Sequence, residues 1–182
     1  MKIRIFVVLF ALVLSCTALL NSCKNDTVQP VNEYITTLKV IAQNLSTNTT
    51  DTFQYVNFNE SRPNPPSYVD TIRLKAKSVY AIQVLLINEA PNPIQMMTDT
   101  IIAKADNHLM VYNIDPSAGM MTVKIQDKDS KGLPLGLFSN WTTIDATNGW
   151  LRMILRHQQG HKNGTETPGS NDFEADFPVV VR

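Results

Sequence analysis

The chain has 182 residues and carries 16 basic and 16 acidic side chains, so its formal net charge is zero. A balanced charge excludes the strongly basic surface with which nucleic-acid-binding proteins hold phosphates. The only cysteines are Cys16 and Cys23, so everything after residue 23 folds without a disulfide.

The first 22 residues have the layout of a secretory signal peptide. Lys2 and Arg4 give a positively charged start, and residues 5–14 contain no charged or strongly polar side chain. A membrane-spanning helix needs about 20 apolar residues, so this run is too short to cross a bilayer. We therefore predict a cleaved signal at 1–22, whose removal leaves 14 basic against 16 acidic residues.

The signal ends in Leu20-Asn21-Ser22-Cys23, which resembles the lipobox of bacterial lipoproteins. The resemblance implies that Cys23 carries a diacylglyceride on its thiol and becomes the first residue of the mature protein. The alternative is an ordinary signal peptide cut after Ala18, with Cys23 left unmodified. A polar leader directly after Cys23 favours the lipoprotein, so we predict a flexible tether at 23–33 and a single domain at 34–182.

From residue 34 onward, apolar and polar side chains alternate with the period of two that is typical of β-strands. Strand 80–87 is apolar on both faces and is predicted to lie centrally in its sheet, whereas 94–104 is predicted to hold a short helix. Asn148-Gly149 is predicted to be a turn. The predicted strands run over residues 37–42, 53–58, 69–75, 80–87, 108–113, 121–126, 133–141, 151–157 and 173–179.

This succession predicts an all-β fold: an antiparallel, two-sheet, immunoglobulin-like sandwich of about eight strands. The alternative is a lipocalin-like β-barrel, whose strands have regular up-and-down connections. Two long connections, at 59–68 and 158–171, fit the barrel less well.

Three histidines are the main candidates for metal chemistry, since the seven methionines fit the hydrophobic core better than a thioether site. His108 begins a predicted strand, His157 ends another, and His161 lies in the loop that follows. Imidazole suits zinc or copper, and Glu166 and Asp172 offer oxygen ligands in the same loop region. His108 and His157 are therefore the candidate ligands of a zinc or copper ion. The alternative is that they are strand-end histidines that hydrogen-bond a loop, with no cofactor.

Sequence signatures of catalysis are missing. There is no Gly-x-Ser-x-Gly, no His-Glu-x-x-His and no phosphate-binding glycine-rich motif. Glu174 and Asp176, two positions apart on one predicted strand, are the acidic pair that suits acid–base work on a glycan. Four aromatic side chains suit either a sugar-binding platform or the core: Tyr55, Tyr80, Trp141 and Trp150. We predict that the protein is not an enzyme.

The segments VKIQDKDSKGLPLG, LRMILRHQ and GTETPGSNDFEADFPVVV, at 123–136, 151–158 and 164–181, extend the resemblance. Together they are similar to uncharacterised Bacteroidetes lipoproteins often labelled as type 1 periplasmic binding fold proteins. The resemblance implies a small outer-membrane lipoprotein that serves TonB-dependent transporters, with histidine also found at positions 108 and 157. The α/β architecture of that label needs helices that this sequence lacks.

The functional expectation is a non-enzymatic binding module anchored at the outer membrane, facing the periplasm or the cell surface. Two alternatives stay open: a zinc- or copper-handling accessory of a TonB-dependent uptake system, and a carbohydrate-active surface protein. The membrane and a TonB-dependent receptor are the expected partners, and nucleic acid is not.

Overall fold

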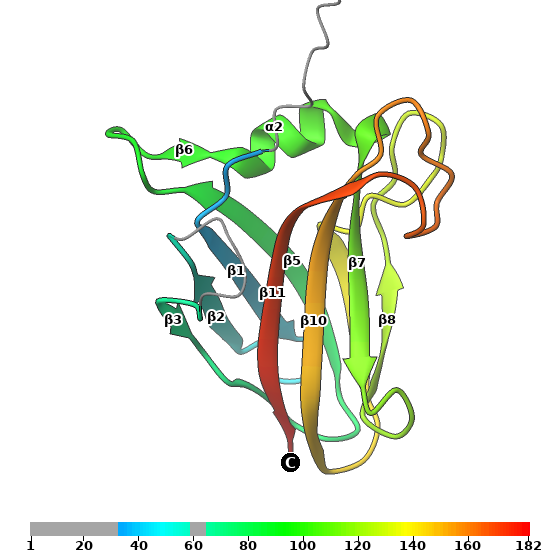
Figure 1. The fold of residues 1–182 in the computed structure, drawn as a ribbon. Coiled ribbons are helices and arrows are strands. Elements are labelled where there is room, and N and C mark those ends of the chain that lie inside the picture. Colours follow the sequence, from blue (N-terminus) through cyan, green and yellow to red (C-terminus); the bar gives the residue numbers. More distant parts are fainter. Residues whose placement is uncertain (1–32, 59–64) are drawn as a thin grey trace, which may run out of the picture. The chain divides into compact units, whose positions relative to one another are not determined.

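Two β-sheets make up the computed structural model, which describes residues 33–58 and 65–182 (Figure 1). One sheet has seven strands in the order β3-β2-β1-β5-β9-β8, with β6 added beside β5, and the other has four in the order β4-β11-β10-β7. The strands of the seven-stranded sheet are β1 (Thr37–Asn44), β2 (Thr50–Val56), β3 (Tyr68–Val69), β5 (Val79–Asn88), β6 (Gln95–Met96), β8 (Met121–Ile125) and β9 (Phe138–Thr143). Those of the four-stranded sheet are β4 (Ile72–Leu74), β7 (His108–Asp115), β10 (Thr147–His157) and β11 (Ser170–Val181).

The hydrophobic core lies between the two sheets. Alternate residues of β1 and β10 are fully buried, as the period of two requires. Aromatic rings also meet across the sheets: Tyr55 of β2 lies 5.9 Å from Phe177 of β11, and Tyr112 of β7 lies 6.0 Å from Trp141 of β9. Burying each large apolar side chain contributes about 1.5–3 kcal/mol.

The described residues thus confirm the predicted all-β sandwich. Their strands form two separate sheets rather than one closed barrel, so the lipocalin-like alternative is wrong. The predicted central strand is also confirmed, since β5 lies between β1 and β9. One strand pair, β4 with β11, is parallel, and every other pair is antiparallel.

The prediction of one strand at 69–75 is wrong, because this segment contributes to two strands, β3 and β4, that belong to different sheets. β3 pairs with β2, whereas β4 pairs with β11. Asp70 fixes the crossing point: its carboxylate accepts the backbone N–H of Gln54 at 2.9 Å, and its own N–H donates to the Gln54 carbonyl. After Asp70 the chain leaves one sheet and joins the other.

The turn predicted at Asn148-Gly149 is also wrong, since both residues lie inside β10. Gly149 serves close strand packing instead: a Cβ atom there would lie 2.2 Å from the Asp115 carbonyl oxygen of β7.

The strand predicted at 133–141 starts later than predicted, since β9 begins only at Phe138. The Asp127 carboxylate accepts the backbone N–H groups of Gly136, Leu137 and Phe138, and so holds the preceding residues outside the sheet.

The predicted short helix is α2 (Met97–Ala103), which lies across one end of the two sheets (Figure 1). Met97 and Ile101 bury their side chains in the core, and the Thr98 hydroxyl accepts the Leu86 N–H of β5 at 2.8 Å. A 3₁₀ turn, η1 (Ala105–Asn107), then leads directly into β7. In the part of the chain that the structure describes, no helix is long and apolar enough to cross a membrane.

Candidate metal centre

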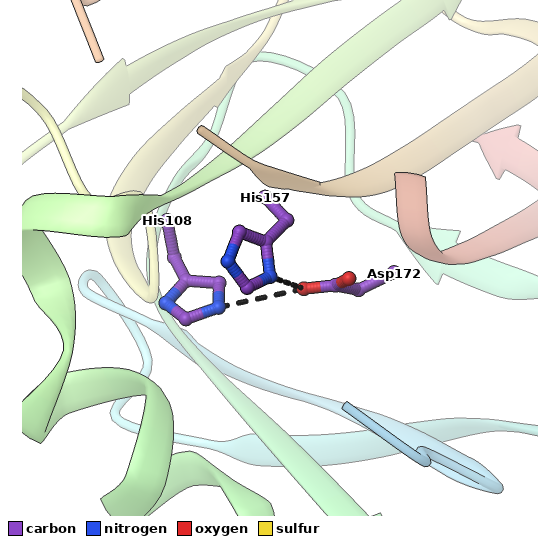
Figure 2. Close-up of side chains that lie close together, drawn as sticks. All are labelled: His108, His157 and Asp172. Carbon is purple, nitrogen blue, oxygen red and sulfur yellow. Dashed lines mark ion pairs between the residues drawn. The ribbon is translucent and has the colours of Figure 1, made fainter. Parts of the chain in front are cut away.

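The ends of three neighbouring strands bring His108, His157 and Asp172 together (Figure 2). His108 is the first residue of β7 and His157 is the last of β10, and the two are direct partners in the strand pairing. Their rings meet edge to face with centroids 4.9 Å apart. The two predicted ligands are therefore neighbours in space, although 48 positions separate them in the chain.

Asp172 reaches the histidines because of a β-bulge. Leu155 pairs with Phe173, but the next residue, Arg156, pairs with Asn171, so Asp172 is an extra residue with no partner across the ladder. A bulge re-aims the side chain that it displaces. The Asp172 side chain is accordingly fully buried, whereas Asp176 of the same strand is 34% exposed.

The loop between β10 and β11 is fitted closely to the end of β10. A Cβ atom at Gly169 would lie 1.8 Å from the His157 carbonyl oxygen, and the φ of Gly169 is +83°, so both space and conformation require glycine. The Arg156 guanidinium donates to the carbonyl oxygens of Pro168 at 3.0 Å and Gly169 at 2.7 Å. These contacts hold the loop, and with it the start of β11, beside His157.

A backbone hydrogen bond sets the tautomer of His108. Its Nδ1 lies 3.0 Å from the Lys104 carbonyl oxygen, which only accepts, so Nδ1 carries the hydrogen. In the neutral ring the other nitrogen, Nε2, then presents a lone pair. A ligating histidine is commonly oriented in this way, through its second nitrogen.

The free lone pair points at a carboxylate. Asp172 Oδ2 lies 3.4 Å from His108 Nε2 and 3.2 Å from His157 Nδ1. All these atoms are buried, and none of them makes a hydrogen bond to any described residue; the same is true of Asp172 Oδ1. Two ring nitrogens and a carboxylate thus converge on one point in a region without compensating hydrogen bonds.

The distances fit a tetrahedral metal site. With metal–ligand bonds of about 2.0–2.1 Å, the ligands of a tetrahedral zinc ion lie about 3.3–3.4 Å apart. Two of the three separations, 3.2 and 3.4 Å, are close to that edge length, and all three ligand atoms lie within 4.8 Å of one another. Two imidazoles and one carboxylate are a common ligand set for zinc, and they suit other first-row divalent ions as well.

Other predicted residues lie elsewhere. His161 and Glu166 are exposed and are not among the grouped ligands. Asp176 forms a two-point ion pair with Arg152, at 2.6 and 3.2 Å, and Glu174 accepts a hydrogen bond from Asn171. Lipidation of Cys23 stays a prediction, because the signal and the tether up to residue 32 fall outside the described residues.

A buried ion pair that the sequence did not indicate supports the neighbouring loops. Lys162 Nζ lies 2.8 Å from Asp129 Oδ2, with both side chains at most 1% exposed, and also donates to the Ala105 carbonyl at 2.9 Å. Burial by itself raises the pKa of Asp129, but hydrogen bonds from Lys162, Leu133 and Lys131 outweigh it and hold that pKa below its ordinary value. The pair ties the loop after β10 to the hairpin loop between β8 and β9 and to η1.

Comparisons with known proteins add no relative to this description. No protein-family model matches the chain, and neither a curated protein nor a solved structure does. The resemblance to Bacteroidetes lipoproteins therefore stays a prediction.

Proposed function

We propose that this protein is a lipid-anchored, non-enzymatic module of the outer membrane that binds a divalent transition metal, zinc foremost, through His108, His157 and Asp172. Anchoring through Cys23 rests on the lipobox-like end of the signal peptide. The metal would be either a tightly held structural ion or cargo exchanged with a partner such as a TonB-dependent receptor.

One observation carries the metal proposal: three ligand atoms are buried together, and none of them makes a hydrogen bond to a described residue. Leaving a buried polar group unsatisfied costs about 1–3 kcal/mol, and more for a charged one. A cation among the three atoms would offset that cost for all of them at once. The fixed tautomer of His108 supports the same conclusion, since it leaves a lone pair rather than an N–H facing the carboxylate.

Burial favours binding over catalysis. His108 and Asp172 have fully buried side chains, and the side chain of His157 is 9% exposed. A catalytic zinc ion keeps a coordination position that substrate or water reaches. Three protein ligands leave the fourth position of a tetrahedral ion to another group, but the burial of these ligands keeps that position away from bulk solvent. The enclosed ligands therefore support retention of an ion.

Zinc titration tests the proposal. The purified protein competes with a chromophoric zinc chelator, and we expect binding of one zinc ion per chain. The His108→Ala/His157→Ala double variant should lose that binding, while His161→Ala, which removes the exposed histidine, should keep it. Absence of zinc, nickel, cobalt and copper binding by the unaltered protein contradicts the proposal, and so does equal binding by the double variant.

A further inference from the structure

A second candidate site lies on the outer face of the four-stranded sheet, away from the core. Of the four aromatic residues that suited a sugar platform, Tyr55, Tyr80 and Trp141 are at most 5% exposed. Trp150 is 55% exposed, and it lies on β10, between β11 and β7 (Figure 1). Only this one of the four offers a ring to a ligand.

Polar side chains surround Trp150 on the same face. Its partners across the ladders are Asp115 of β7 and Pro178 of β11. Residues two positions away on a strand share its face, which adds Asn148 and Arg152, both exposed. A shallow depression of about 460 Å³ is lined by Trp150 together with Asp115, Asn148 and Pro178.

Arg152, the basic residue next to Trp150, has a carboxylate partner. The Arg152 guanidinium donates to both Asp176 oxygens, at 2.6 and 3.2 Å, so its positive charge is matched by a carboxylate. The row Asn148, Trp150, Arg152 thus presents an amide, an indole and a paired guanidinium, with donors and acceptors on both sides of the ring.

We propose that this row binds a carbohydrate. The C–H face of a pyranose ring is apolar and slightly electropositive, so it stacks on the electronegative face of an indole. The ring hydroxyls both donate and accept hydrogen bonds, which suits amide, guanidinium and carboxylate neighbours. From Asn148 to Arg152 the strand rises roughly 14 Å, enough for about two or three linked sugar rings.

Other occupants fit the face less well. A protein partner that covered Trp150 by apolar contact would also cover Asp115 and Asp176 beside it, and interfaces are depleted in aspartate. An anionic lipid surface attracts clusters of unpaired Lys and Arg. On this face the arginine beside Trp150 is already neutralised, so a neutral polar ligand is the better match.

Affinity electrophoresis tests the proposal. The full chain, purified in a detergent without sugar headgroups, runs on native gels that contain hydroxyethylcellulose, xylan, glucomannan, laminarin or dextran. We expect retardation by at least one polysaccharide. Trp150→Ala should weaken that binding at least tenfold and Trp150→Phe should restore part of it. Phe138→Ala, which removes an exposed aromatic ring from the other sheet, should leave it unchanged.

Because the Trp150 side chain is exposed, Trp150→Ala should fold, and unchanged zinc titration verifies this independently of sugar binding. Retardation by none of the five polysaccharides overturns the proposal, as does equal retardation of the Trp150→Ala variant. Two other results, each without polysaccharide binding, would assign this face to another occupant and likewise overturn the proposal. One is self-association that depends on Trp150, and the other is Trp150-dependent binding of the Cys23→Ser variant to phosphatidylglycerol vesicles.

Discussion

His157 Nδ1 lies 3.2 Å from Asp172 Oδ2, and a single bulge in β11 makes this contact. In a regular ladder Asp172 would stand on the same face as Glu174 and Asp176, away from the core. The extra residue instead turns its carboxylate toward the two histidines. The candidate metal centre thus depends on a local break in the strand pattern as much as on its ligands.

Asp172→Asn should lower zinc affinity at least about 100-fold, because even changes to groups that only support a ligand cost 10–100-fold. The amide keeps the shape of the carboxylate but removes its charge. In the metal-free protein, urea unfolding should show no loss of stability, since the carboxylate charge that is removed is buried and accepts no hydrogen bond from a described residue. Asp176→Asn is the matched control, because it changes an acid of the same strand outside the centre. Equal zinc affinities for the two variants would contradict the ligand role.

Gly169→Ala should destabilise the loop beside His157 for two reasons, the left-handed backbone conformation and a steric clash. Gly160 provides the comparison: its φ is +73°, similar to the +83° of Gly169, but a side chain there meets open space. Each substitution carries the left-handed cost of about 1–2 kcal/mol. Only Gly169→Ala adds the clash with the His157 carbonyl oxygen. Urea unfolding should therefore give Gly169→Ala a clearly lower free energy of unfolding than Gly160→Ala. Gly169→Ala should also bind zinc more weakly. Equal stability of the two variants would mean that the close fit has no energetic weight.

Asp129→Asn should cost about 3 kcal/mol, the lower end of the range for removing one partner of a buried ion pair. Lys162 would then lose its carboxylate inside the loop region. The exposed Asp145→Asn is the control, with an expected change within about 0.5 kcal/mol. Urea unfolding at neutral pH measures both, and an Asp129→Asn variant as stable as Asp145→Asn would refute the role of the pair.

The Asp129–Lys162 ion pair should make the stability of the fold depend on pH. The pKa of Asp129 is lower in the folded chain than its ordinary value of about 4, so its contribution to stability is complete above pH 4. It is lost as the pH falls through the lowered pKa, because the unfolded chain then binds the proton more readily. Between pH 6 and pH 2, the free energy of unfolding should fall less for Asp129→Asn than for the unaltered protein. Parallel curves would exclude Asp129 as a source of acid sensitivity.

Cys23→Ser should abolish lipid attachment to residue 23 and block cleavage before it. Cys16→Ser is the internal control, since that cysteine lies within the predicted signal and should have no effect on anchoring. Cell fractionation with immunoblotting and mass spectrometry of the N-terminus measure both outcomes. An unaltered protein that is missing from the membrane fraction and begins at residue 19 would favour an ordinary signal peptide over the lipobox.

Much of the fold follows from local pattern. The alternation along β1, β5 and β10 predicts strands, and the double-faced apolar character of β5 predicts its central place. Local pattern does not predict the secondary structure where contacts between distant segments determine it. Asn148-Gly149 is a common turn dipeptide, but pairing with β7 and β11 keeps it in a strand.

The candidate site was predictable in its residue types but not in its geometry. His108 and His157 stood out as strand-end histidines, and Asp172 as an oxygen ligand nearby. Their convergence depends on the register of β7 against β10 and on the bulge in β11, neither of which leaves a signal in a single sequence. The ion pair of Asp129 leaves no signal in the sequence either, because its partner, Lys162, comes 33 positions later.

Zinc K-edge X-ray absorption of the zinc-loaded protein identifies the ligands of the proposed zinc site. We predict a single site with two imidazole ligands and at least one oxygen ligand, at about 2.0–2.1 Å, and one fewer imidazole in His108→Ala. A spectrum without imidazole scattering, or one that His108→Ala leaves unchanged, would contradict it.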